Sequence, residues 1–542
     1  GAPVGGGSAA AGKEREAAGE CAPTPGVVRD LAAASVGPGA FRSKFRRNRT
    51  RLRELLADAA ARVGTEVTVK GWVRTMRSAQ KNTLLFVELN DGSCFASLQV
   101  VAAQDGCQGF AAAAACGGAG ASLAVTGRVV ESPAQGQAVE LQASLVRVLG
   151  VMTDPKAYPL SKKFHTMEHL REVAHLRARA RIHSTAMRVR HEMALATHQF
   201  FHARGFAYIH TPLITSADCE GAGEQFVVTT LLNPGAAAGP EAHGGAGAHA
   251  PPKAPKLPTN KDGSVDWSKD FFGRQTCLTV SGQLNVETHA CAMSDVYTFG
   301  PTFRAENSHT SRHLAEFWMI EPEMCFADIW DDMDLAEDYL KHLIAHALAH
   351  CQEDLEFLET FRGGEKGLRR RLTHVLESDF VRITYTEAIE LLQKEVAAGK
   401  AKFEETPEWG IDMGSEHERY LTEQLFKKPT IVRDYPKDIK AFYMKLNPDG
   451  RTVAAMDILV PKIGEIIGGS EREADLGTLT RRAAEMGLSP EDIWWYLDLR
   501  KYGTVKHCGF GLGFERLILF ITGIDNIRDV IPFPRHPGKA EF

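Results

Sequence analysis

The pattern of hydrophobic and polar residues changes along the chain and predicts two kinds of folded region. Between residues 67 and 149, short apolar-polar alternations are separated by turn residues, as in half-buried strands. The runs are VTVKGWV, TLLFVEL, FASLQVV, SLAVTGRVV and VELQASLVRVL. Five such strands with glycine at the bends predict a closed Greek-key barrel of the OB type. A different small barrel without a ligand is the alternative.

The second half of the chain mixes helical and strand patterns. MALATHQFFHARGFAYIHTPLI predicts a helix, a glycine stop and a strand that ends near Pro212. We expect RQTCLTVSGQLNVETHACAM, DVYTFGPTFRAEN and EFWMIEPEMCFA to be strands of an antiparallel sheet, and residues 331–404 to be mainly helical. CGFGLGFERLILFITG predicts a glycine-rich strand that passes into an apolar helix. The fold class predicted is α+β.

Composition shifts set the predicted domain boundaries. Residues 1–45 are rich in Ala, Gly, Ser and Arg, which predicts a disordered or targeting tail, although Glu14, Glu16, Glu20 and Asp30 oppose targeting. The barrel domain is predicted at 46–152, a hinge at 153–180 and the sheet-and-helix domain at 181–542. A low-complexity insertion at 232–264 has too little apolar surface to offset the entropy of ordering.

Charge and composition limit the function classes. The 542 residues are 44% hydrophobic and 24% charged and carry a net charge of −5. This is typical of a soluble globular protein, and any nucleic-acid surface must be local. The sequence contains no run of about 18 apolar residues, so we expect neither a membrane span nor a membrane partner. None of the ten cysteines are spaced as C-x-x-C, which disfavours a zinc ribbon.

Polar side chains gather in FRAENSHTSRHLAEF. Arg304 and Glu306 are predicted on one face of a strand, because strand side chains alternate with period two. Arg312 and His313 follow in a polar loop. Arginines bind phosphoryl oxygens with planar, bidentate donors, so the hairpin suits polyphosphate. A surface hairpin with an ion pair is the alternative.

Two later stretches add ligands for the same chemistry. In GEIIGGSEREADL, Glu465 can bind Mg²⁺ when phosphates supply the other oxygens, and Arg472 follows seven positions later. In GFGLGFERL, glycines allow a close backbone approach to a ligand, and Arg516 can stack on a purine ring. Neither stretch taken alone distinguishes a ligand site from an ordinary structural segment.

Together these motifs resemble one family. GFAYIHTPLI, FRAE…RHLAEF and GFGLGFERL are similar to motifs 1, 2 and 3 of class II aminoacyl-tRNA synthetases. The barrel ahead of them resembles the anticodon-binding OB domain of the aspartate, asparagine and lysine subgroup. The resemblance covers about residues 50–542. It implies a catalytic antiparallel sheet flanked by helices, ATP and Mg²⁺ as cofactors, and an aminoacyl-adenylate intermediate.

The resemblance also assigns the ATP site residue by residue. Arg304 would hold the α-phosphate, Glu306 the adenine side, and Arg312 with His313 the outer phosphates. Arg516 would cover the adenine face. Arg304, Glu306 and Arg516 are thus the expected catalytic residues. Leu314, Phe317, Glu465, Gly513 and Glu515 would complete the ATP site, and Glu465 with the backbone near Gly468 would bind the metal.

The amino-acid site implied by the resemblance favours L-asparagine over aspartate. The stretch SGQLNVE has Val286 where aspartate relatives, with QLYKQ, have a lysine. Glu287 would accept hydrogen bonds from a carboxamide NH₂, and Arg472 would donate to its oxygen. Glu220 would meet the α-amino group, and Gln283 and Gly468 would complete this site. A structural ion pair is the alternative for Glu287.

In the barrel, the resemblance places Phe86 on an anticodon base, with Arg77 and Gln99 beside it. A core role is the alternative for Phe86. The implied partners are tRNA(Asn), L-asparagine and a second copy of the chain, docked through motif 1 with Pro212. A chloroplast or mitochondrial location is favoured, with a bacterial cytoplasm as the alternative.

Three other functions compete with this interpretation. An aspartate-charging relative is disfavoured by Val286 and Glu287. A tRNA-independent asparagine synthetase with the same catalytic fold would lack the barrel. A nucleic-acid-binding OB protein with a degenerate catalytic half would lack residues such as Arg304 and Arg516, which this chain has.

Overall fold

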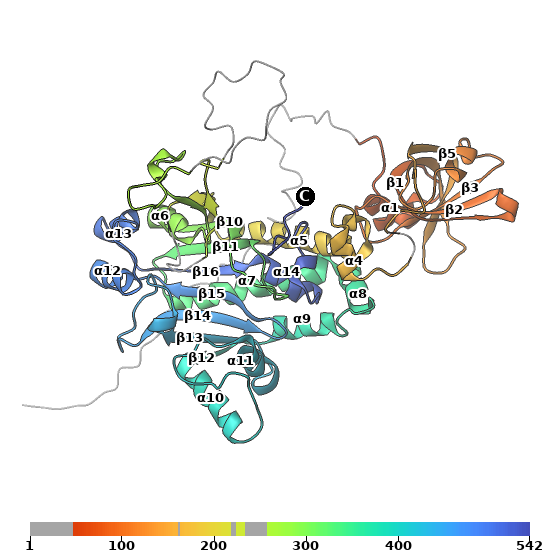
Figure 1. Cartoon of the computed structure of the whole chain (residues 1–542). Coiled ribbons are helices and arrows are strands. Elements are labelled where there is room, and N and C mark those ends of the chain that lie inside the picture. The colour runs from red at the N-terminus through yellow and green to blue at the C-terminus, as the bar shows by residue number, and fades with distance from the viewer. Residues whose placement is uncertain (1–46, 161–162, 218–223, 233–256) are drawn as a thin grey trace, which may run out of the picture.

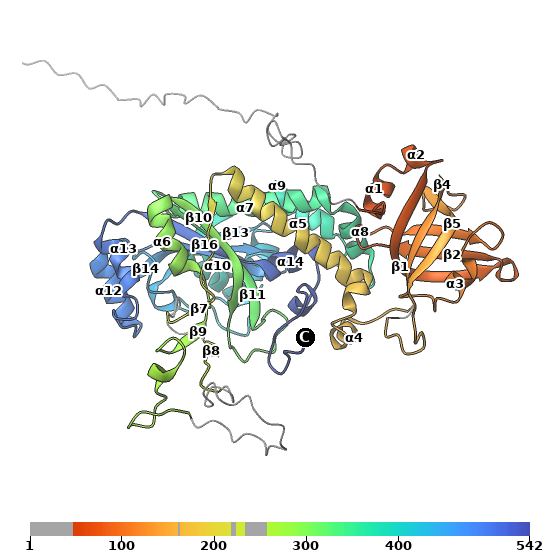
Figure 2. The ribbon, with the colours of Figure 1, turned by 90° about the horizontal axis from the view of Figure 1, so that it is seen from above.

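The computed structural model describes residues 47–160, 163–217, 224–232 and 257–542. A small barrel lies at one end of the molecule and a larger sheet-and-helix domain forms the rest (Figure 1). The 23-residue helix α5 (Arg181–Ala203) begins on the barrel side and runs along the larger domain (Figure 2). No helix in the described part of the chain is long and apolar enough to cross a lipid bilayer.

The barrel confirms the five strands predicted from the sequence. Its closed order is β1-β2-β3-β5-β4, and the 14-residue β1 pairs with both β2 and β4. A bulge between Val73 and Thr75 lets β1 bend around the barrel. The strands are β1 (Glu66–Ala79), β2 (Leu84–Asn90), β3 (Leu98–Ala103), β4 (Ser122–Glu131) and β5 (Val139–Gly150). Short helices α1 (Leu52–Ala57), α2 (Ala59–Arg62) and α3 (Phe110–Ala114) accompany them.

The larger domain is built on an eight-stranded sheet of order β12-β13-β14-β15-β16-β11-β10-β6. The six strands from β13 to β10 are antiparallel, as predicted, whereas the outermost strands β12 and β6 run parallel to their neighbours. The bounds are β6 (Ala207–Tyr208), β10 (Asp295–Phe303), β11 (Glu316–Cys325), β12 (Val381–Thr384), β13 (Thr430–Pro436), β14 (Thr452–Val460), β15 (Gly464–Glu471) and β16 (His507–Gly513). A separate small sheet joins β7 (Ile214–Thr215), β9 (Thr276–Leu278) and β8 (Val227–Val228).

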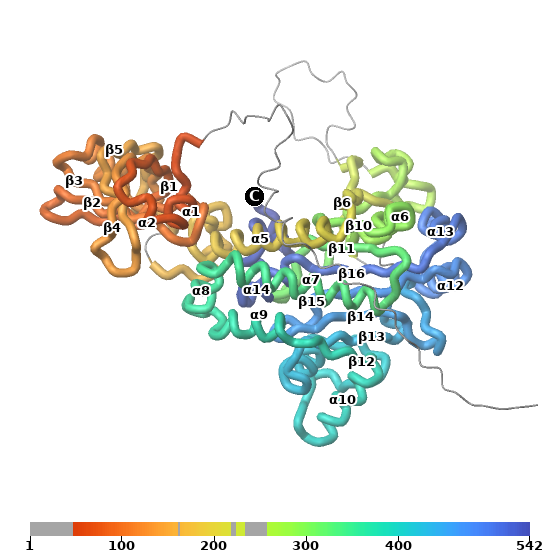
Figure 3. The backbone as a smooth tube through the Cα atoms, turned by 180° about the vertical axis from the view of Figure 1, so that it is seen from behind, coloured from red at the N-terminus to blue at the C-terminus, as the bar shows by residue number. Residues whose placement is uncertain are grey.

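Helices cover one face of the large sheet and leave the other for the site. Helices α5, α7 and α9 lie side by side across the covered face (Figure 3). On β11, Ile320 is fully buried in the core with these helices, whereas Met319 and Glu321 point to the opposite face and line a cavity. The remaining bounds are α4 (Met167–Glu172), α6 (Gln283–Met293), α7 (Ile329–His350), α8 (Gln352–Thr360), α9 (Leu368–Glu377), α10 (Tyr385–Ala397), α11 (Ser415–Tyr420), α12 (Leu476–Glu485), α13 (Trp494–Lys501) and α14 (Phe514–Thr522).

Two local predictions were wrong. QLNVETHACAM forms helix α6 rather than a strand, and only Thr276–Leu278 of that region is extended. Its buried residues Gln283, Glu287 and Ala290 recur at spacings of four and three, which is the helical period. Strand β10 ends at Phe303, so Arg304 and Glu306 follow the strand instead of lying in it.

Candidate active site

One cavity brings together all ten residues expected at the ATP site. It lies where β11, β15 and β16 meet the loop after β10. The predicted residues that line it are Arg304, Glu306, Arg312, His313, Leu314, Phe317, Glu465, Gly513, Glu515 and Arg516. The strand-to-helix junction at Gly513 confirms the predicted glycine-rich strand followed by an apolar helix. We call this space the nucleotide cavity; ATP binding there stays a prediction.

Three arginines give the nucleotide cavity its positive charge. Arg312 is held by the turn between β14 and β15, since its Nη1 and Nη2 donate to the carbonyls of Ile463 (2.6 Å) and Lys462 (3.0 Å). The guanidinium carbon of Arg304 lies 5.4 Å from the ring centroid of Phe317. Arg516 Nη1 donates to Glu465 Oε2 at 3.0 Å. Several guanidinium groups around one cavity suit a polyphosphate anion.

Glu515 lines the same cavity, but its carboxylate is engaged by the protein. The backbone N–H of Trp318 donates to its Oε2 at 2.9 Å, and Arg190 Nη2 lies 2.7 Å from its Oε1. These contacts tie α14 to β11 and to α5. Glu515 therefore holds the strand-to-helix junction in place beside the cavity.

An acidic group adjoins Glu465 and was missed by the sequence analysis. Asp457 on β14 pairs with Lys440 Nζ at 2.8 Å, and Glu418 Oε2 accepts the backbone N–H of Glu465 at 3.1 Å. Burial and the neighbouring Glu465 raise the pKa of Glu418 to about 8. Burial opposes ionisation of Glu465 as well. The positive charges of Arg516 and Lys440 outweigh this effect, so the pKa of Glu465 lies below its usual value.

The chemistry of this acidic group fits a divalent cation. A Cβ on Gly468 would lie 3.0 Å from Glu465 Oε1 and 3.2 Å from Asp457 Oδ1, so the glycine leaves room beside both carboxylates. Within the described ranges, no three His, Cys, Asp or Glu residues are grouped so that they could hold a metal ion. Mg²⁺ commonly takes one or two carboxylates and draws its remaining oxygens from phosphates and water.

A second cavity adjoins the first and shares Arg304, Met319, Glu465 and Gly511 with it. We call it the amino-acid cavity. Of the residues predicted to bind the amino acid, Gln283, Gly468 and Arg472 line it. Glu287 does not line it and lies one helical turn behind Gln283. Glu220 lies outside the described residues.

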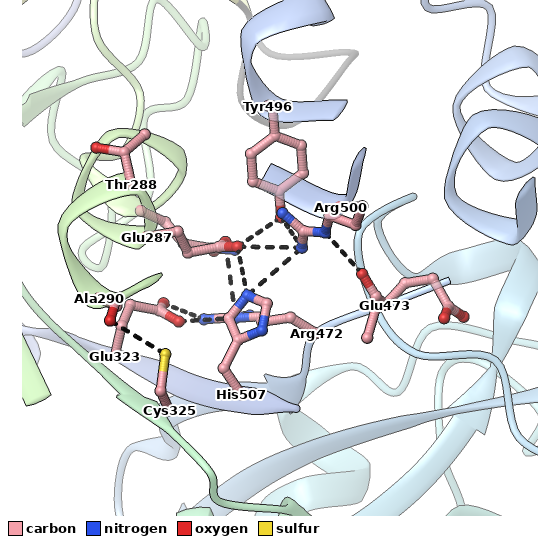
Figure 4. Close-up of polar contacts among 12 residues, drawn as sticks. Glu287, Thr288, Ala290, Glu323, Cys325, Arg472, Glu473, Tyr496, Arg500 and His507 are labelled. Carbon is pink, nitrogen blue, oxygen red and sulfur yellow. Dashed lines mark hydrogen bonds and ion pairs between the residues drawn. The ribbon is translucent and has the colours of Figure 1, made fainter. Parts of the chain in front are cut away.

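Glu287 is fully buried at the centre of a polar network (Figure 4), and the sequence analysis, which kept a structural ion pair as the alternative, named none of Tyr496, Arg500 and His507 as its partners. Its Oε1 accepts from Gln283 Nε2 at 3.1 Å. Its Oε2 accepts from Tyr496 Oη (2.7 Å), His507 Nε2 (3.0 Å) and Arg500 Nη2 (3.3 Å). Burial raises the pKa of Glu287, but the hydrogen bond and charge of His507 and the charges of Arg500 and Arg472 reverse the effect and hold the pKa far below its usual range. Glu287 is therefore a carboxylate that can only accept hydrogen bonds.

The contacts of His507 favour its protonated, positively charged form. Its Nδ1 lies 2.8 Å from the carbonyl oxygen of Val505, and its Nε2 faces the Glu287 carboxylate. Both partners are acceptors, which favours a proton on each ring nitrogen, while the Arg500 guanidinium 3.5 Å from Nε2 opposes the charge. Burial lowers the pKa of His507, but Glu287 outweighs that effect and raises it above the ordinary value.

We expect the charge of His507 to make stability depend on pH. Because the folded-state pKa exceeds the unfolded value, its contribution is complete below about pH 6.5 and is lost as the pH rises through the folded pKa. In H507Q this dependence disappears, because glutamine donates to Glu287 without titrating. Thermal midpoints measured from pH 6 to 9 should therefore fall more steeply for the parent chain than for the variant. Parallel profiles would mean that His507 is neutral.

A third cavity holds the residues predicted to bind the anticodon. Arg77, Phe86 and Gln99 all line it, and the Arg77 guanidinium carbon lies 4.6 Å from the Phe86 ring centroid. Phe86 is half-buried on the outer face of β2, whereas Leu85 and Val87 enter the barrel core. Residues of α8 and Arg181 also line this cavity.

Family comparisons agree with this architecture. A profile for class II tRNA synthetases (D, K and N) matches residues 166–238 and 253–537, and an OB-fold nucleic-acid-binding profile matches 67–149. An asparagine–tRNA ligase of Protochlamydia amoebophila is 52% identical over 91% of this chain and 98% of its own length. An asparagine–tRNA ligase of Haemophilus influenzae is 54% identical over 89% of this chain and 97% of its own length.

A solved structure shares the fold over most of both chains. The crystal structure of asparaginyl-tRNA synthetase from Pyrococcus horikoshii with asparaginyl-adenylate aligns at a TM-score of 0.72 and 29% identity. The alignment covers 91% of this chain and 99% of that one. The two ligases named above are bacterial, and the compartment of this chain stays a prediction.

Proposed function

Because this chain belongs to the class II tRNA synthetases for aspartate, lysine and asparagine, we propose that it ligates L-asparagine to tRNA(Asn). The observation that carries this function is the junction of two cavities at Arg304 and Glu465. One cavity holds the expected ATP residues and the other offers polar groups that suit an amino acid.

The reaction proceeds in two displacements. The carboxylate of asparagine attacks the α-phosphorus of ATP, which forms asparaginyl-adenylate and releases pyrophosphate. A ribose hydroxyl at the tRNA terminus then attacks the carbonyl carbon and releases AMP. No residue forms a covalent bond, so the protein acts by positioning and by neutralising phosphate charge.

The shared wall of the two cavities indicates where the reacting atoms meet. In the adenylate the α-phosphate lies between the adenosine and the amino acid. A residue that lines both cavities is therefore well placed to contact that phosphate. Arg304 is the cation that lines both cavities, and it would neutralise charge at the reacting phosphorus. Arg312 and His313 would contact the outer phosphates, and Glu306 and Arg516 the adenine.

Mg²⁺ would be held by Glu465 and Asp457 beside Gly468. Mg²⁺ held there would supply positive charge to stabilise the phosphate oxygens. Lys440 and Arg516 pair with the two carboxylates and keep them in place in the absence of the ion.

Selection of asparagine would depend on the groups around Arg472. Its guanidinium donates to Glu323 through Nε (3.2 Å) and Nη2 (2.5 Å), and to Ser470 Oγ through Nη1 (2.8 Å). Guanidinium has five N–H groups, so two remain for a substrate amide oxygen. The buried charge of Glu287, 3.9 Å from Arg472 Nε, would repel the carboxylate of aspartate.

The function is tested by pyrophosphate exchange with purified protein. We expect exchange into ATP that requires asparagine and Mg²⁺, and transfer of asparagine to tRNA(Asn). Absence of asparagine-dependent exchange in a folded preparation would contradict the proposal.

The barrel cavity would bind the anticodon, with a base stacked on Phe86. In F86L the bulk is kept but the stacking face is lost. We expect kcat/KM for tRNA(Asn) to fall by about tenfold or more, since stacking contributes about 1–3 kcal/mol per base. Pyrophosphate exchange, which needs no tRNA, should be unchanged. Replacing Leu149, an exposed residue on β5, with alanine is the matched control. Normal tRNA kinetics in F86L would place the anticodon elsewhere.

We further propose a homodimer formed through the motif 1 region. Leu195 on α5, Tyr208 on the edge strand β6, and Leu213 and Ile214 after it are all exposed. Exposed apolar groups around an unpaired strand edge suit association with a second chain. Light scattering should give about twice the chain mass of 59.3 kDa, and a mass of one chain would contradict the dimer.

A further inference from the structure

The carboxylate of Glu287 has two sides with different surroundings (Figure 4). Its Oε2 accepts from Tyr496, Arg500 and His507. Its Oε1 faces Gln283 and, at 3.9 Å, Arg472. Gln283 and Arg472 line the cavity, whereas Tyr496, Arg500 and His507 do not. Glu287 therefore connects a buried cluster on α13 and β16 to two side chains that a substrate can touch.

This connection fixes which end of the Gln283 amide faces the cavity. An ionised carboxylate can only accept, so Gln283 must turn its NH₂ group toward Glu287. The amide is planar, and its Oε1 then points away from Glu287. No described residue donates to that oxygen, and Gln283 lines the amino-acid cavity. The cavity thus gains a hydrogen-bond acceptor.

Arg472 supplies the complementary donor. Glu323 and Ser470 hold its guanidinium in one orientation, and its two other N–H groups are left for a ligand. One acceptor and one donor match a carboxamide, which has an NH₂ and an oxygen. A carboxylate offers two acceptors and would leave Gln283 Oε1 facing an anion.

The buried cluster holds Glu287 through several contacts. Tyr496 Oη donates to Glu287 and accepts from Arg500 Nη2 at 2.9 Å. Arg500 Nε donates to the backbone carbonyl of Glu473 at 2.9 Å, which anchors the arginine itself. The side chains of Tyr496, Arg500 and His507 are almost completely buried, so water cannot readily replace them.

We propose that Tyr496, Arg500 and His507 are positioning residues for amino-acid selection, which hold Glu287 so that Gln283 presents its carbonyl oxygen to a carboxamide substrate. The inference rests on the proposed function and deepens it, because it assigns selectivity to residues that do not touch the substrate. The direct contacts are made by Gln283 and Arg472.

The test uses Tyr496→Phe, which removes one hydroxyl and keeps the ring. We expect KM for asparagine to rise about tenfold, which is the lower range for a hydrogen bond to a charged group. The preference for asparagine over aspartate should fall by a similar factor. In contrast, kcat and KM for ATP should stay within about twofold of the parent values. Tyr502→Phe, at the exposed end of α13, is the matched control.

A second pair of variants separates positioning from folding. His507→Gln keeps a donor to Glu287 and should leave KM for asparagine within about threefold of the parent value, whereas His507→Leu should raise it about tenfold. A purely structural role would instead lower the thermal midpoint and the active fraction, with KM unchanged. That result, or unchanged KM in Y496F, would overturn this inference alone. Absence of asparagine-dependent exchange in the parent protein would overturn the proposed function as well.

Discussion

Replacing Arg304 with glutamine is expected to lower asparagine-dependent pyrophosphate exchange by about 10³-fold. Arg304 lines both cavities and is the cation at their shared wall. Charge that develops on the phosphate in the transition state would lose its nearest counter-charge. Because the ground-state complex carries less of that charge at the phosphorus, kcat should fall far more than KM for ATP or asparagine rises.

The control for this variant is R382Q. Arg382 pairs with Asp334 and Glu337 on α7 and lines neither cavity. We expect exchange within twofold of the parent value, because these partly buried ion pairs hold β12 to α7 and involve no residue of either cavity. A loss of less than tenfold in folded R304Q would show that another group neutralises the α-phosphate.

Replacing Glu287 with glutamine is expected to lower the preference for asparagine over aspartate by about 10²-fold or more. The like charge that opposes aspartate is removed, and such a charge costs several kcal/mol. Arg472 and Arg500 are then left with less counter-charge and would attract a substrate carboxylate. The measurement is kcat/KM for both amino acids, normalised to the titrated active sites.

E287Q should also be less stable, by about 3–5 kcal/mol, because it leaves buried cations without their partner. Kinetics should therefore be measured well below its thermal midpoint. E359Q, which breaks the ion pair between Glu359 and Arg369 on the surface, is the matched control and should retain the parent preference. A folded E287Q with unchanged preference would reduce Glu287 to a structural acid.

The sequence predicted the fold well where its periodicity was long. Five alternating runs gave the barrel, and the glycine-rich strand before an apolar helix was found at β16 and α14. Helix α6 was missed because QLNVETHACAM is short and follows a true strand, β9. Its helical spacing of buried positions becomes clear only once the packing is known.

The sequence predicted the residues of the candidate site that lie in motifs, but it did not predict those that lie outside them. Residues that lie in quoted motifs, such as Arg304 and Arg516, do line one cavity. Asp457 could have been noticed as a single acid within the apolar strand TVAAMDILV. Tyr496, Arg500 and His507 carry no such signal. They meet Glu287 from more than 200 positions away, and only the tertiary fold brings them together.

The most direct test of carboxamide selection is charging of tRNA(Asn) by the intact protein with asparagine and aspartate side by side. A site built on matched hydrogen bonds can discriminate by about 10⁴-fold without editing. We therefore expect strong charging with asparagine and negligible charging with aspartate. Comparable rates with the two amino acids would contradict this expectation, because neither Glu287 nor the orientation of Gln283 would then select the carboxamide.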